Sequence, residues 1–142
     1  MKISDILRHK GSSVVTIGPA DPVTDLLARL AEHNIGALVV VDRDAVVGIV
    51  SERDVVRRLN TDGAELLSRS VSEVMTSSVV SCAPGDSVDS IGAAMTELRV
   101  RHMPVLTGGQ LAGIVTIGDV VAGRIRQLEQ DRVQLEGYIT HG

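Results

Sequence analysis

The sequence predicts an α/β fold of the α+β type, in which two β-α-β-β-α repeats pack as a pseudo-twofold pair. The main observation is that the segment Gly48 to Asp54 returns 65 residues later as Gly113 to Asp119. At that offset, without gaps, residues 12–56 and 77–121 are identical at 16 of 45 positions. Within each copy, apolar residues switch between helical spacing and short strand-like runs.

The shared positions go beyond a common hydrophobic pattern. They include turn, cap and acidic residues: Pro19 and Pro84, Asp21 and Asp86, Glu32 and Glu97, Gly48 and Gly113. Apolar periodicity alone would not make such positions agree, so we interpret the chain as an internal duplication. Because a unit of about 50 residues buries too little surface to be stable alone, we expect the two copies to share one hydrophobic core.

The first copy begins with a short β-rich run from Val14 to Ile17. Asp21 followed by Pro22 is typical of an N-cap and first-turn pair, so we expect a helix to begin there. Apolar residues spaced for one helix face then follow, and the second copy repeats them. They are Val23, Leu26, Leu27 and Leu30 in the first copy, and Val88, Ile91 and Met95 in the second.

Two apolar runs follow, over residues 37–41 and 46–50, and we expect both to be buried strands. Asp42-Arg43-Asp44 separates them as a tight hairpin turn, as Thr107-Gly108-Gly109 does in the second copy. Ser51 and Thr116 are placed to cap the next helices. The first of these should end near Asn60, and the second can continue through Glu136, because its helical spacing persists at Val121, Ile125, Leu128 and Leu135.

This pattern divides the chain into four parts. We expect a first repeat over residues 1–60, a linker over 61–70, a second repeat over 71–123 and a C-terminal helical extension over 124–142. Short similar segments open the two repeats, Ile3 to Leu7 and Val71 to Met75. We call these two segments the openers.

Composition restricts the classes of function. No apolar run reaches the roughly 18 residues of a membrane span, and the polar start lacks a signal-peptide pattern, so we expect a cytoplasmic protein without a membrane partner. One cysteine and four scattered histidines lack metal-ligand spacing, and we expect no metal. No phosphate-binding loop or nucleophile elbow is present, so we expect no catalytic residues and no cofactor.

The duplicated Ser/Thr-x-x-Asp motif combines groups that suit a nucleotide. A hydroxyl at a helix N-terminus, together with the first-turn N–H groups, favours an anion such as phosphate. One turn later, the carboxylate of Asp54 or Asp119 can accept hydrogen bonds from two ribose hydroxyls. The glycine of the motif allows backbone or ligand to approach closely. The same spacing also fits a capping box that only satisfies the helix's own N–H groups, and both interpretations stay open.

These residues resemble the cystathionine β-synthase (CBS) domain, present as a tandem pair often called a Bateman module. The resemblance runs from the Ser-Asp/Glu-Ile/Val openers through Val121, and its most specific part is Gly-apolar-apolar-Ser/Thr-x-x-Asp at the close of each copy. The chain is most similar to small stand-alone bacterial CBS-pair proteins. The resemblance implies a regulatory module that binds an adenosine-containing ligand, such as AMP, ADP, ATP or S-adenosylmethionine, in clefts between the copies.

The resemblance also implies how the clefts are built, since phosphates on a ribose held by one copy are met by basic residues of the other. The first site then has Ser51 and Asp54 with Arg101 and His102, and the second has Thr116 and Asp119 with Arg53. We expect the first to hold phosphate better. Adenine is expected between aliphatic side chains near the first strands, and the alternative for each residue is core packing. These residues are Thr16, Ile17, Ile35, Ser81, Cys82, Val100 and Met103.

In related pairs two modules associate through their second helices, and we expect a homodimer that signals to an unidentified regulated protein. The helices after Ser51 and Thr116 carry more apolar surface than a small module covers by itself, at Val55, Val56, Leu59, Val120, Val121, Ile125 and Leu128. Extension to Leu135 lengthens this surface, with Arg132 as a polar interruption.

Two alternative functions remain. The chain can be a ligand-free scaffold or dimerisation module whose clefts are filled by side chains. It can also bind nucleic acid through a patch formed by Arg53, Arg57, Arg58, Arg99 and Arg101. A net charge of −4 and the presence of one aromatic residue, Tyr138, argue against nucleic acid, which favours a basic face and stacking platforms.

Overall fold

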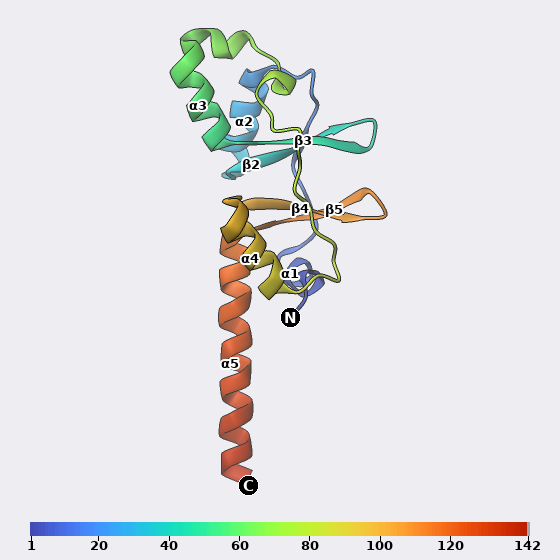
Figure 1. Cartoon of the computed structure of the whole chain (residues 1–142), viewed down its shortest axis with the longest axis vertical. Coiled ribbons are helices and arrows are strands. Elements are labelled where there is room, and N and C mark those ends of the chain that lie inside the picture. The colour runs from blue at the N-terminus through green and yellow to red at the C-terminus, as the bar shows by residue number, and fades with distance from the viewer. Residues whose placement is uncertain (142) are drawn as a thin grey trace.

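The fold is described from a computed structural model that covers residues 1–141, with side chains described through Ile139. Gly142, the last residue of the expected C-terminal extension, lies outside the described residues. Figure 1 shows an elongated molecule whose two halves lie one above the other, with a long C-terminal helix that extends away from both. None of the helices in the described part combines the length and apolar character that a membrane span requires.

The first repeat has the expected β-α-β-β-α order. Its first two strands are parallel and joined by a helix, and the second and third form an antiparallel hairpin with Val39 opposite Ile49. In chain order the elements are β1 (Thr16–Ile17), α2 (Val23–His33), β2 (Ala37–Asp42), β3 (Ala45–Ser51) and α3 (Glu52–Asp62).

The second repeat keeps this order except at its first strand. That strand is reduced to a single bridge between Cys82 and Val105, because Pro104 has no N–H to continue the ladder. The elements are α4 (Val88–Leu98), β4 (His102–Thr107), β5 (Gln110–Thr116) and α5 (Ile117–His141). Helix α1 (Ile3–Lys10) and the 3-10 helices η1 (Gly63–Ser68) and η2 (Val71–Glu73) precede the two repeats.

Both hairpins turn where the sequence predicts. Arg43 and Asp44 have φ values of 50° and 66°, and Gly108 and Gly109 have 57° and 80°. Two successive positive φ values are typical of the type I′ turn, whose twist matches that of the strands. Strand β2 is largely buried, as expected, but β3 and β5 are only partly so: each begins with an exposed residue and then has two buried residues among half-buried ones.

One predicted helix start was wrong. Helix α2 begins at Val23, with Pro22 at the N-cap position, rather than with Asp21 as N-cap. Asp21 Oδ2 instead accepts a hydrogen bond from Gly18 N at 2.8 Å and so closes the turn before the helix. Asp86 does the same with Ala83 N at 2.9 Å. The identical aspartates of the two copies therefore serve the turn.

The two openers are exchanged between the repeats. Ile3 N donates to Asp86 O, and at the equivalent place Val71 N donates to Asp21 O, each at 2.9 Å. Val88 N donates to Met1 O as Val23 N donates to Arg69 O, both at 3.0 Å. The first opener, in α1, therefore belongs to the second repeat, and the second opener, around η2, belongs to the first.

This exchange corrects the expectation of one shared core, because two separate clusters of buried side chains are found. The opener of the other repeat completes each cluster. The cluster of the first repeat contains Ile17, Val23, Leu26, Leu30, Leu38, Val40, Val50, Leu66, Val71 and Val74. The cluster of the second contains Ile3, Ile6, Cys82, Val88, Ile91, Met95, Met103, Val105, Val115 and Val120.

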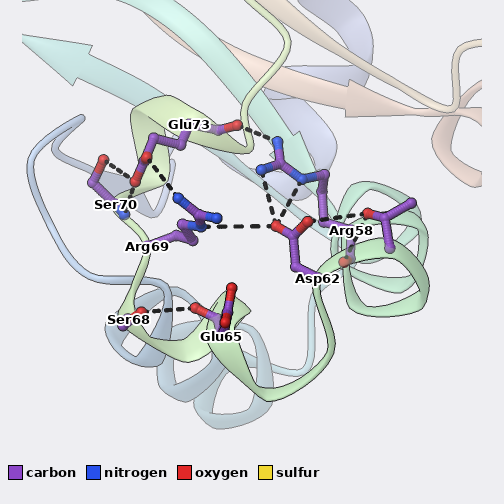
Figure 2. A network of polar contacts seen from close by, with 8 residues as sticks. Arg58, Asp62, Glu65, Ser68, Arg69, Ser70 and Glu73 are labelled. Atoms are coloured by element: carbon purple, nitrogen blue, oxygen red, sulfur yellow. Dashed lines mark hydrogen bonds and ion pairs between the residues drawn. The ribbon is translucent and has the colours of Figure 1, made fainter.

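A polar network holds the second opener against α3 (Figure 2). The Arg58 guanidinium donates to Asp62 Oδ2 at 3.0 and 3.2 Å and to Glu73 O at 2.5 Å. Arg69 adds ion pairs to Asp62 at 3.8 Å and to Glu73 at 3.6 Å. Arg58 is thus committed to the fold, unlike the other arginines of α3.

Candidate functional site

A cleft of about 270 Å³ lies between the two repeats, and we call it cleft one. The start of α3 forms one wall, and the loop between α4 and β4 forms the opposite one. The chain after the second opener closes a third side, where Thr76 pairs with Ile49 of β3 through hydrogen bonds of 2.8 and 3.0 Å. The lining residues are Gly36, Ala37, Ile49, residues 51–54, Arg57, Thr76, Ser78, Val80 and residues 99–102.

The motif at the start of α3 forms a complete capping box inside this cleft. Ser51 Oγ accepts from Asp54 N at 3.3 Å, and Asp54 Oδ2 accepts from Ser51 N at 2.9 Å. Ser51 Oγ also donates to Asp54 Oδ2 at 3.1 Å. These bonds stabilise the helix start. They also fix the direction of the carboxylate of Asp54, which lines the cleft and has no ion-pair partner among the side chains described, through Ile139.

Four guanidinium groups line the same cleft. Arg53 and Arg57 lie one turn apart on α3, and Arg99 and Arg101 come from the loop after α4. Arg53 Nη1 donates to Arg99 O at 3.5 Å. None of the four forms an ion pair with any residue of the described chain. Like charges gathered in this way repel one another, and a bound anion such as phosphate would relieve that repulsion.

His102 lies at the same wall. A Cβ on Gly36 would stand 3.3 Å from the imidazole, so the absence of a side chain at Gly36 gives this ring its space. Burial lowers the pKa of His102, and the nearby charges of Lys10 and Arg101 act in the same direction against Glu52 and Asp119. The imidazole is therefore held neutral at neutral pH, as a hydrogen-bonding group rather than a fixed charge.

The second copy of the motif has a different environment. Thr116 and Asp119 form the same reciprocal bonds, at 2.9 and 3.0 Å. In addition, Lys10 Nζ donates to Asp119 Oδ2 at 2.6 Å and to Ile114 O at 3.0 Å. Burial alone would raise the pKa of Asp119, but hydrogen bonds from Lys10 and Thr116 outweigh it and keep this pKa below its ordinary value. We call these groups the second motif site.

Comparison with known proteins identifies the family. The family model for the CBS domain matches residues 3–61 and 71–125, one match for each repeat. The chain belongs to the CBS domain family. The mitochondrial CBS domain-containing protein CBSX3 of Arabidopsis thaliana is 33% identical over 149 residues, which cover 99% of this chain and 72% of the relative.

Solved structures agree with this assignment and with the predicted fold class. A CBS-domain containing protein from Agrobacterium tumefaciens is 43% identical with a TM-score of 0.85, over 87% of this chain and 99% of that one. CBSX2, solved in complex with AMP, is 25% identical with a TM-score of 0.74, over 88% of this chain and 96% of that one. The family model ends at Ile125, so the rest of α5 is an addition to the CBS pair.

The CBS pair brings together the four residues expected at the first site: Ser51, Asp54, Arg101 and His102 all line cleft one. The expected partner of the second site does not lie there. Arg53 lines cleft one as well, because it extends from the first turn of α3 toward Arg99. Lys10, which the sequence did not indicate, occupies the second motif site instead.

The expected adenine residues divide into two groups. Val100 lines cleft one, whereas the other six expected residues do not. Ile17, Cys82 and Met103 are buried in the two cores, Ile35 packs against the first core, Thr16 is half-buried and Ser81 is exposed. Burial raises the pKa of the Cys82 thiol to about 11, as expected for a small apolar core residue.

Other residues of cleft one were not expected from the sequence. Thr76, Ser78 and Val80 reach it because the second opener is exchanged, so that the following segment runs past β3. A signal was nevertheless present, because the openers repeat at their own spacing: Ile3-Ser4-Asp5 resembles Val71-Ser72-Glu73. Their spacing also shows that Lys10 and Ser78 each lie three residues beyond an opener.

Proposed function

We propose that this CBS pair is a regulatory, non-catalytic module that binds an adenine nucleotide in cleft one. The observation that supports this most is that four arginines, none of which has an ion pair within the described residues, gather with the capped Asp54 around one cleft. A ligand that binds here must offer hydroxyl groups to the acid and negative charge to the arginines. A ribose phosphate has hydroxyls and negative charge together. The AMP complex of CBSX2 supports the choice of an adenine nucleotide.

Each group of cleft one is assigned a role in this proposal. Asp54 accepts hydrogen bonds from the ribose hydroxyls, and the N-terminus of α3 with Ser51 attracts phosphate. Arg101, His102 and Arg53 donate to the phosphates. Adenine lies against the aliphatic side chains that line the cleft, Ile49, Val80 and Val100. In the second motif site, Asp119 is the corresponding ribose-binding group and Thr116 the corresponding phosphate-binding group.

A thermal-shift panel of AMP, ADP, ATP and S-adenosylmethionine tests the proposal. A ligand at 100 times its Kd stabilises a folded chain by about 2.7 kcal/mol, which is easily seen as a rise in Tm. Asp54→Ala should remove most of that rise, since two charge-assisted hydrogen bonds contribute about 1.5–3 kcal/mol each.

Glu73→Ala is the matched control, because Glu73 closes a similar capping box with Ser70 N at 2.8 Å outside cleft one. It should lower the Tm and leave the ligand-induced rise intact. If no adenosine compound at millimolar concentration raises the Tm, the proposal is wrong and the scaffold alternative is favoured.

The proposal includes a homodimer through α3 and α5, which lie on the same side of the molecule (Figure 1). Two of the seven residues expected at this interface face inward: Val120 is buried in the second core, and Val55 packs against the first. The other five are exposed, from 51% to 65%: Val56, Leu59, Val121, Ile125 and Leu128. An open groove of about 520 Å³ between α4 and α5 adjoins this surface.

The extension of α5 continues the exposed stripe with heptad spacing. Val121, Ile125, Leu128, Arg132, Leu135 and Ile139 follow one another at intervals of four and three residues. Leu128 and Leu135 then take d positions and Ile125 and Ile139 take a positions, which favours a two-stranded coiled coil. A second copy of the chain is the occupant that fits such a stripe. The cytoplasmic location and the regulated protein stay predictions.

A further inference from the structure

The second motif site and cleft one differ, among other positions, in the residue that lies three positions beyond the opener packed beside each motif. Ile3 N and Val71 N make matching bonds to Asp86 O and Asp21 O, and Ser4 N and Ser72 N make matching bonds to Pro84 O and Pro19 O. Lys10, at the end of α1, and Ser78, in an irregular segment, each lie three residues beyond an opener. Because the openers are exchanged, Lys10 lies beside the second repeat and Ser78 beside the first.

The two side chains have opposite effects on the acid beside them. Ser78 lines cleft one and carries no positive charge that could neutralise Asp54. The Lys10 ammonium lies on Asp119, 2.6 Å from Oδ2, and is also held by Ile114 O at 3.0 Å. The pair is partly screened from water, since the side chains of Lys10 and Asp119 are 29% and 23% exposed. A partly buried ion pair of this kind is costly to separate.

The groups that would compensate for displacing Lys10 line cleft one, although Arg101 O accepts from Ile117 N and His102 pairs with Thr116 beside the second motif site. Arg101 and His102 stand at the wall of cleft one, whereas their equivalents in the first repeat are Gly36 and Ala37, which cannot donate from a side chain. Arg53 lies in cleft one too. A nucleotide entering beside Asp119 would therefore separate the ion pair without gaining a comparable group of arginines.

We infer that Lys10 closes the second motif site, so that each chain binds one nucleotide, at Asp54. Lys10 is thus the residue that sets the stoichiometry, and replacing it with a serine opens a second site at Asp119. The inference rests on the proposed function for the class of ligand. It adds that the motif at Asp54 is free to bind the nucleotide and that the motif at Asp119 is not, because Lys10 is bonded to Asp119.

Isothermal titration calorimetry with AMP tests this. The wild-type chain should bind one AMP, and Asp54→Ala should abolish that binding. Lys10→Ser should bind two, and Lys10→Ser with Asp119→Ala should return to one. Lys10→Arg keeps the positive charge beside Asp119 and should stay at one. Lys10→Met keeps the side-chain stem without the charge, and it replaces Lys10→Ser if that variant does not fold.

Two AMP molecules on the wild-type chain, with one lost in Lys10→Ser, would show that Lys10 is a phosphate ligand and overturn the inference. Lys10→Ser and Lys10→Met variants that fold but gain no Asp119-dependent site would overturn it as well, whether or not the wild type binds AMP. A third outcome is that the wild-type chain binds no AMP, whereas Lys10→Ser gains a site that depends on Asp119. That outcome would support the inference and contradict the proposed function for cleft one.

Discussion

Leu7 lies directly over Gly113: a Cβ on that glycine would stand 2.7 Å from Leu7 Cδ2. Met75 and Gly48 repeat the relationship, with 2.5 Å between such a Cβ and Met75 Sδ. The glycine that is identical in both motifs therefore makes room for the exchanged opener rather than for a ligand. The duplicated Pro19/Pro84 and Asp21/Asp86 pairs serve the same contact, because their carbonyls accept from the openers.

The first prediction follows from this contact. Gly113→Ala should lower the free energy of unfolding by about 1–3 kcal/mol, because overpacking forces Leu7 to move. Chemical denaturation measures the change. Gly85→Ala is the control and should have little effect, since no atom lies within 4 Å of its Cβ position. The double variant Gly113→Ala with Leu7→Ala should lose less free energy of unfolding than the two single variants lose together. Additive losses would contradict the contact.

A second prediction separates phosphate recognition from sugar recognition. Arg101→Ala should weaken the binding of AMP by about tenfold or more, because a guanidinium bonded to phosphate contributes about 1.5–3 kcal/mol. The loss of affinity should be larger for ATP. Adenosine, which has no phosphate, should bind almost as before. Arg126→Ala, which changes a half-buried arginine of α5 outside cleft one, is the control. Equal losses for adenosine and ATP would mean that Arg101 is only structural.

A third prediction concerns pH. Burial holds the pKa of His102 in the folded chain below its ordinary value of 6.5. Since the folded state then binds fewer protons than the unfolded state, the stability that neutral His102 provides is fully present above about pH 6.5 and is lost as the pH falls through the lower pKa. Denaturation between pH 8 and pH 5 should show a smaller loss in His102→Gln than in wild type. Equal losses would show that His102 does not contribute to this pH dependence.

The fourth prediction tests the dimer. Sedimentation equilibrium at micromolar concentration should give twice the 15.0 kDa of one chain. Leu128→Glu should shift the equilibrium strongly toward monomer, because it places a charge at a d position of the stripe. Val133 is the matched control, since it is similarly exposed at 60% but lies outside the stripe, and Val133→Glu should stay dimeric. A wild type that is monomeric with and without AMP would remove the interface.

Local features of the fold were predictable because the sequence encodes them locally. The hairpin turns at Asp42 and Thr107 and the cap at Ser51 depend on neighbouring residues, and all are found. The misplaced start of α2 shows the limit of this logic. Asp21 suits an N-cap, but its carbonyl and carboxylate are used by the second opener and by Gly18, neither of which local propensity takes into account.

The sequence by itself determined the duplication, the order of elements and the motif residues Ser51, Asp54, Thr116 and Asp119, since these follow from periodicity and identity at a fixed offset. Only the tertiary structure decided that the openers exchange, that Arg53 lies in cleft one and that Lys10 lies on Asp119. The physical reason is that these contacts join residues far apart in the chain. Which side chain reaches a given acid depends on how the helices and sheets pack, and two similar motifs therefore acquire different surroundings.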